Sequence, residues 1–253
     1  MKLDRISGFC LAMAVCFFAF AQDTSLTRAD VAAIKAKLVK VQQAMGVEPQ
    51  GYLKESEDFN LPTDASPTQT GKYWPVTASV SLRYTDKASK EGIDNAEKAA
   101  KEFEAKYATA MASGDPNAMI QMSEEMMRIS QMAAAAGMST QAKEDMTAYI
   151  QFNMNSYTGI DPDAVVFESP GAIALRDTDV EGEEGQVTVY LDPVALRQTE
   201  TLSKVEIKTP DDGVTSKSGV YNVTISLHGT IADIEAWVKS FNTGEMLAVI
   251  DSQ

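Results

Sequence analysis

The sequence predicts an α+β fold in which helices cover one face of a mainly antiparallel sheet. Three stretches, 76–84, 187–191 and 221–227, alternate apolar and polar residues, as a strand does when one face is buried and the other is wet. Shorter apolar runs at 165–167 and 172–175 add further strands. Segments with helical periodicity lie before and between these strands, and such one-sided strands are typical of antiparallel sheets covered on one side.

The first residues have the layout of a cleaved export signal. Lys2 and Arg5 precede an apolar run from Phe9 to Ala21, which ends in the small-x-small site Ala19-Phe20-Ala21. The run is short for a bilayer span, although an uncleaved anchor is the alternative. We therefore expect residues 1–21 to be removed near Ala21. The mature protein is then periplasmic or secreted, without stable membrane insertion.

Composition excludes several function classes. Both cysteines, Cys10 and Cys16, lie inside the signal, so the mature chain has no disulfide, thiolate nucleophile or cysteine-based metal site. The formal net charge of −14 disfavours nucleic acid as a partner, although solubility alone also explains it. The sequence contains no phosphate-binding GxxxxGK loop, no GxSxG nucleophile elbow and no HExxH zinc motif.

Residues 22–46 predict a separate amphipathic helix. Thr27 and Asp30 form a capping-box-like start, and Gly46 suits the end of the helix. Its narrow apolar stripe consists of Val31, Ile34, Leu38, Val41 and Met45. Residues 47–71 contain Pro49, Pro62 and Pro67 without periodicity and are expected to form a linker. We expect this N-terminal helix to bind a partner or a second copy; packing against the chain's own helical insertion is the alternative.

Residues 72–253 are expected to form one α+β domain with a three-helix insertion at about 87–158, after the first strand. The first two helices form an antiparallel hairpin divided by Gly114. The third is expected to begin at Ser139 or Thr140. The apolar stripes of the hairpin are Ile93, Ala96, Ala100, Phe103, Tyr107 and Ala110, then Met119, Met122, Met126, Ile129, Ala133 and Ala136. The stripe of the third helix is Met146, Tyr149, Ile150 and Asn153.

The last fifty residues predict the order β-β-α-β. A strand with Val205 and Ile207 precedes the strand 220–227, a helix that begins at Thr230, and a final strand at 246–250. This order is similar to the ferredoxin-like periplasmic modules of bacterial pilus and type II secretion assembly proteins. The resemblance covers a fifth of the chain and concerns the pattern of elements. It implies an interaction role in the cell envelope.

Nine of the thirteen methionines lie between Met111 and Met154. Met119, Met122 and Met126 stand at i, i+3 and i+7, a spacing at which thioethers could bind copper(I). The same residues belong to the apolar stripe, and methionine is a flexible filler of cores. We therefore predict that they are core residues. Ile120 and Met127 lie off the stripe and indicate that a second side of this helix is contacted.

Two other features suggest chemistry. The loop Asp177 to Gly182 matches the first half of a calcium-binding loop, but Thr188 stands where a bidentate Glu belongs, and a solvated turn is the favoured interpretation. His228 is the only histidine, and its phase places it on the polar face of a strand. No catalytic residue, cofactor or metal ligand is assigned.

We therefore expect an exported, non-enzymatic cell-envelope protein that acts by protein binding or assembly. Two alternatives stay open. One is an exported metal-binding protein, with copper on the methionine-rich helix or calcium in the acidic loop. The other is a carboxylate-based hydrolase, because Asp and Glu are abundant and their geometry is not visible in a sequence.

Overall fold

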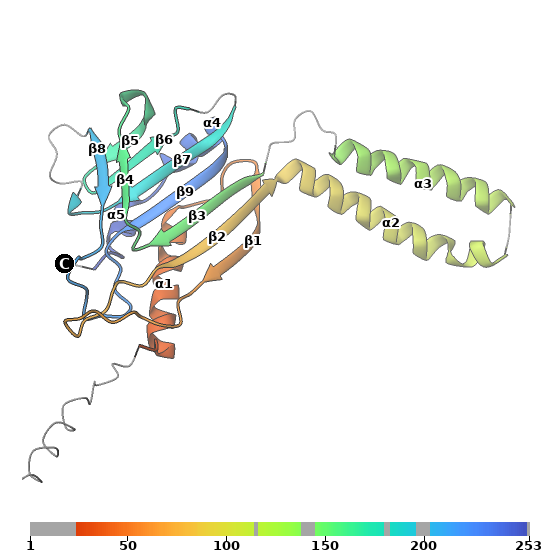
Figure 1. Ribbon diagram of the computed structural model, residues 1–253. Coiled ribbons are helices and arrows are strands. Elements are labelled where there is room, and N and C mark those ends of the chain that lie inside the picture. The colour runs from red at the N-terminus through yellow and green to blue at the C-terminus, as the bar shows by residue number, and fades with distance from the viewer. Residues whose placement is uncertain (1–23, 114–115, 138–144, 180–182, 196–202, 252–253) are drawn as a thin grey trace, which may run out of the picture.

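The computed structural model describes residues 24–113, 116–137, 145–179, 183–195 and 203–251. These residues form a mixed α+β structure with a large antiparallel sheet and five α-helices, which confirms the expected fold class (Figure 1). The expected export signal lies outside the described residues.

The large sheet has seven strands in the order β1-β2-β3-β9-β7-β6-β5, and every neighbouring pair is antiparallel. Its strands are β1 (Tyr52–Asn60), β2 (Ala78–Asp86), β3 (Met146–Phe152), β5 (Val165–Ser169), β6 (Ala172–Arg176), β7 (Glu184–Leu191) and β9 (Val223–Thr230). A second sheet pairs β4 (Ser156–Gly159) with β8 (Lys204–Ile207). The helices are α1 (Arg28–Ala44), α2 (Lys87–Ser113), α3 (Pro116–Gly137), α4 (Ile231–Val238) and α5 (Thr243–Leu247), and a 3-10 turn spans Pro162–Ala164.

Helices α1, α4 and α5 pack against one face of the large sheet and form the main core with it. The strands supply every second residue to this core, as the sequence alternation predicts. Trp237 of α4 stands edge-on between Tyr84 of β2 and Phe241, with ring centroids 5.2 Å and 5.3 Å apart. Its indole N–H donates to the carbonyl of Val47 at 3.0 Å, so the polar end of this buried ring is satisfied.

The N-terminal helix is part of this core, which corrects the expectation that it is a separate interaction element. The capping box of Thr27 and Asp30 is present as predicted. The stripe residues Ile34, Leu38 and Val41, however, are buried against the sheet of the same chain. A helix of nearly five turns draws most of its stability from packing of its apolar face, and the apolar sheet face offers the nearest cover. These residues are therefore not available to a partner.

The expected linker 47–71 contains a strand. Residues 52–60 form β1, the edge strand beside β2, with a register shift between Lys54 and Ser56. Most β1 side chains are exposed, so the strand has no apolar alternation from which it could have been predicted. Its charged side chains suit an edge, because they oppose pairing with another chain.

The expected third helix is wrong in its inner residues. Met146 to Phe152 form β3, which lies between β2 and β9 and pairs with both. Met146, Ala148, Ile150 and Phe152 are buried, so the true period is two. The run also fits a helical period, and only the two neighbouring strands decide between the two structures. Residues 139 and 140, the expected start of the helix, lie outside the described residues.

The C-terminal order also differs from the expected β-β-α-β. The expected strand at 246–250 falls in α5 and the turn after it, and the side chain of Asn242 caps α5 by accepting from the N–H of Glu245 at 3.2 Å. Strand β8 pairs with β4 outside the large sheet. The β4–β8 pair covers part of the other face of the large sheet through a small second core of Ile173, Leu175, Tyr190, Val205 and Ile207.

Helices α2 and α3 form a hairpin that projects from one end of the large sheet (Figure 1). The main contacts of α3 are with α2, and α2 contacts the body chiefly through β2. At 27 residues, α2 is about 40 Å long. In the part of the chain that the structure describes, no helix combines the length and the apolar character needed to cross a bilayer.

Replacing Leu38 tests the place of α1 in the core. Because this side chain is fully buried, we expect Leu38→Ala to lower the free energy of unfolding by about 2–5 kcal/mol in urea denaturation. The matched control is Lys40→Ala, which changes an exposed residue of the same helix and should change stability by about 0.5 kcal/mol or less. Equal stability of the two variants would contradict the docking of α1.

Candidate protein-interaction site

The hairpin is fixed directly to the sheet, because α2 begins where β2 ends. Asp86, the last residue of β2, accepts a hydrogen bond from the N–H of Ser89 at 2.8 Å and so caps the first turn of α2. The N–H of Lys87 donates to the carbonyl of Gly51 at 2.8 Å, beside the start of β1. The helix therefore continues the strand with no loop between them.

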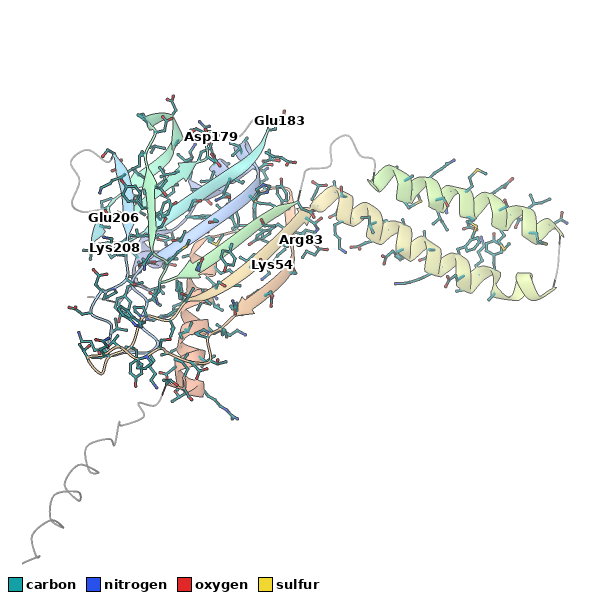
Figure 2. All side chains as sticks on the ribbon, in the orientation of Figure 1. Lys54, Arg83, Asp179, Glu183, Glu206 and Lys208 are labelled. Carbon is teal, nitrogen blue, oxygen red and sulfur yellow. The ribbon has the colours of Figure 1, made fainter. Side chains whose placement is uncertain are left out.

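An ion pair joins the two ends of the hairpin segment. Arg83, which lies on β2 near the base of the hairpin (Figure 2), donates to the carboxylate of Asp145 from Nη2 at 2.6 Å and from Nε at 3.2 Å. Its Nε also lies 3.3 Å from Glu55 of β1. The hydrogen bond that Arg83 donates to Asp145 is the largest cause of its raised pKa, and the charges of Asp145 and Glu55 follow. These contacts hold the residue before β3 against β2.

The seam between the two helices is aromatic on the α2 side. Phe103 and Tyr107 are buried, with ring centroids 5.0 Å apart. Glu125 of α3 accepts hydrogen bonds from Lys106 Nζ and from the Tyr107 hydroxyl, both at 2.9 Å. The pKa of Glu125 is lowered by the hydrogen bond from Lys106 first and that from Tyr107 second, so the carboxylate is held in its charged form. On α3 the half-buried Met122 and Ile129 complete the seam.

A second stripe of α3 begins beside this seam and extends round the helix to its outer side. Its large side chains are exposed: Met119 by 53%, Ile120 by 61%, Met126 by 56% and Met127 by 61%. These four residues, together with Ser123, Ser130, Ala133 and Ala134, are called the outer stripe. Its members repeat at seven-residue steps along the helix. The prediction that the methionines are core is therefore wrong for Met119 and Met126, because the hairpin has no further element to cover them among the described residues.

The outer stripe also carries no charge, unlike the exposed side of α2. The charged residues of α3 are Glu124, Glu125 and Arg128. Those of α2 are Lys87, Lys90, Lys98, Lys101, Lys106, Glu91, Asp94, Glu97, Glu102 and Glu104. Helix α2 thus has the charged surface expected of a helix in water, whereas α3 presents apolar side chains in a contiguous row. Such a row is typical of an interaction surface.

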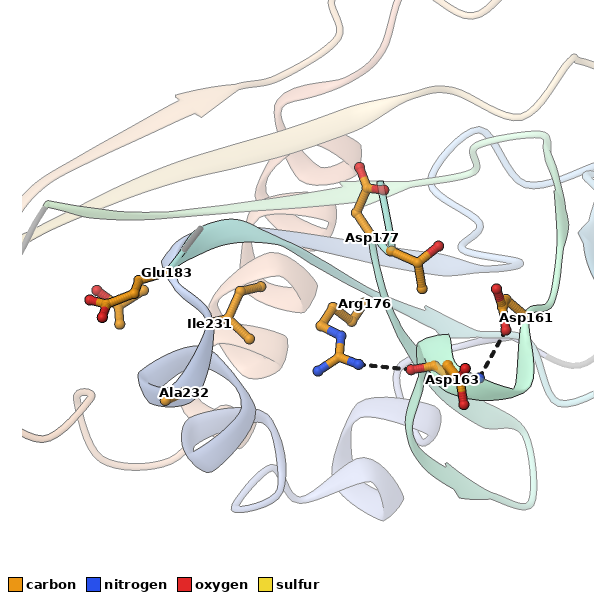
Figure 3. A pocket seen from close by; sticks show the side chains of 9 residues that line it. Asp161, Asp163, Arg176, Asp177, Glu183, Ile231 and Ala232 are labelled. Carbon is orange, nitrogen blue, oxygen red and sulfur yellow. Dashed lines mark hydrogen bonds between the residues drawn. The ribbon is translucent and has the colours of Figure 1, made fainter. Parts of the chain in front are cut away.

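A cavity of about 750 Å³ lies elsewhere, beside the start of α4. Figure 3 shows Asp161 and Asp163 on one side of it and Glu183 with Ile231 on the other, with Arg176 between. The guanidinium of Arg176 donates to Glu235 at 3.1 Å and to the carbonyl of Asp163 at 2.9 Å.

The cavity is acidic in its chemistry. Because Arg176 is already paired, the lining presents mainly carboxylates, including that of Asp177. A small cation or a basic group suits this lining, and the hydrolase alternative would require its carboxylates. Among the described residues, no group of three or more His, Cys, Asp or Glu side chains has a metal-binding arrangement.

The remaining candidates from the sequence are the acidic loop that begins at Asp177 and the histidine His228. Asp177 and Asp179 lie in a turn after β6, where the N–H of Asp179 donates to the Asp177 carboxylate at 3.1 Å. Residues 180–182 of the expected calcium loop lie outside the described residues, and Thr188 is in strand β7 as expected. His228 is exposed on β9, between Thr147 and Gln186 of the neighbouring strands. Its predicted position on the polar face is confirmed.

The comparisons with known proteins identify no relative. No model of a protein family, no curated protein and no solved structure matches this chain significantly. A proposal of function therefore rests on the structure alone, and the outer stripe is the feature that sequence reasoning missed. Ile120 and Met127, which lie off the predicted seam, were the signal that α3 has a second apolar side.

Two truncations distinguish the seam from the outer stripe. We expect Phe103→Ala to lower the free energy of opening of the hairpin by up to about 3–5 kcal/mol, because it removes a buried ring. In dilute protein, where the chain is monomeric, Met126→Ala should change it by about 0.5 kcal/mol or less, because the side chain is exposed on the single chain. Hydrogen exchange of α2 and α3 amides measures both effects, with the amides of β3 as the internal control. A large loss of protection in Met126→Ala would restore the core interpretation.

Proposed function

We propose that this chain is an exported, non-enzymatic protein that works by binding another protein chain, and that the outer stripe of the α2–α3 hairpin is its binding surface. The observation that carries the proposal is an uncharged, exposed apolar row on a helix that projects from the body. Burying apolar surface is favourable by about 25 cal/mol per Å². Burial of this row against a partner helix would therefore lower the free energy.

The residue types of the outer stripe support binding of an apolar helix. Methionine side chains are unbranched and polarisable, so they adapt to partners of different shape. The small residues Ser123, Ser130, Ala133 and Ala134 allow a second helix to approach closely. The direct attachment of α2 to β2 holds the stripe away from the acidic body, which lowers the repulsion of an acidic partner.

This surface replaces the N-terminal helix as the proposed site of partner binding. The stripe of α1 faces the chain's own sheet, whereas the outer stripe has no cover among the described residues. Export supports a role in the cell envelope, where the resemblance of the C-terminal pattern first suggested one. The differences in α5 and β8 weaken that resemblance, so the proposal rests on the hairpin alone.

Protein binding accounts for more of the outer stripe than copper binding does. Copper(I) would use the thioethers of Met119, Met122 and Met126. Copper binding leaves Ile120, Ala133 and Ala134 without a role, although these residues continue the same uncharged row. The acidic cavity favours a cation or a basic ligand, but it lies on the body and does not explain why the hairpin projects.

Site-specific photo-cross-linking tests the binding surface. We expect a photoreactive amino acid at Met127 to give a defined adduct with a protein chain in the native cell. The same probe at Lys98, on the charged side of α2, should give none, because that side is solvated. Equal labelling at the two positions, or none at either, would exclude the outer stripe as a binding surface.

The proposal of export has its own test. We expect mass spectrometry of the native protein to find Gln22 as the N-terminal residue, because Ala19-Phe20-Ala21 forms the cleavage site. A native chain that retains Phe9 to Ala21 would show instead that the apolar run is kept as an anchor.

A further inference from the structure

We propose that the partner of the outer stripe is a second copy of this chain, and that two hairpins pair antiparallel through α3 to form a four-helix bundle. This inference rests on the proposed function and specifies the partner. Two features of the hairpin favour self-pairing: its charge, and the distribution of the large and small residues of α3.

The charge of the chain restricts how two copies can meet. The formal net charge is −14, yet α2 and α3 together carry six basic and seven acidic residues, a net charge of −1. Nearly all of the negative charge therefore lies outside the hairpin. Two copies that meet through the outer stripes do so where repulsion is weakest. An antiparallel arrangement also places the two acidic bodies at opposite ends of the bundle, about 40 Å of helix apart.

The outer stripe is bulky in its first half and small in its second. Met119, Ile120, Met126 and Met127 come first, and Ala133 and Ala134 follow. In an antiparallel pair centred on Met126, the bulky half of one copy faces the small half of the other. Large and small residues then alternate across the interface, which is how helices interdigitate at close distance. A parallel pair would instead set bulk against bulk at one end and leave a gap at the other.

Single cysteines test the register, because the only cysteines of the chain are Cys10 and Cys16. In the full chain with serine at both positions, we expect Met126→Cys to form an intermolecular disulfide on mild oxidation, since the two positions face each other. Met119→Cys should not cross-link to itself, but it should cross-link to Ala133→Cys in a mixture of the two proteins. Cross-linking of Met119→Cys to itself would indicate a parallel pair and overturn the proposal.

Sedimentation of the full chain tests the partner without a cross-link. We expect a dimer that Met126→Lys converts to a monomer, while Lys98→Glu on α2 leaves it intact. A chain that is monomeric at all concentrations excludes the second copy. If Met127 nevertheless cross-links to a different protein in the cell, the proposed function stands and only this inference fails.

Discussion

The apolar face of the seven-stranded sheet is the constraint on which the rest of the body depends. An antiparallel sheet with one apolar face is stable in water only when that face is covered. Helices α1, α4 and α5 come from opposite ends of the sequence and supply this cover together. The N–H of Asn242, just before α5, donates to the carbonyl of Ala44, the last residue of α1, at 2.8 Å, so the two ends of the chain are joined beneath the sheet.

A buried polar side chain stabilises the central strands of the same sheet where β3 ends. Asn153 follows β3 with a positive φ of 57° and is buried. Its amide donates to the carbonyls of Val76 and Gly219 at 2.7 Å and 2.8 Å, and its oxygen accepts from the N–H of Tyr221 at 2.8 Å. One side chain thus joins the segments that enter or leave three central strands. Asparagine tolerates this backbone conformation better than most residues, and its hydrogen bonds offset the cost of burial.

The hairpin buries its apolar surface in a different way from the body. Its seam buries Phe103 and Tyr107, and its attachment at Asp86 makes it an extension of β2. The body has an apolar face and three helices to cover it, whereas α3 has two apolar sides and, among the described residues, packs chiefly against α2. A projecting helix with an uncovered apolar side is stable when another chain completes the packing. The surplus of apolar surface on α3 is therefore the basis of the proposed binding surface.

The sequence by itself determined the α+β class, most strands of the sheet, the capped helix α1 and both helices of the hairpin, because these have strong local periodicity. Only the tertiary structure decided the remainder. β1 is an exposed edge without alternation, 146–152 fits two periods until β2 and β9 pair with it, and α5 is a short apolar run. The burial of Leu38 and the exposure of Met126 were also undetermined. Both lie on regular apolar stripes. Such a stripe indicates that burial of its side chains is favourable, but it does not indicate which surface buries them.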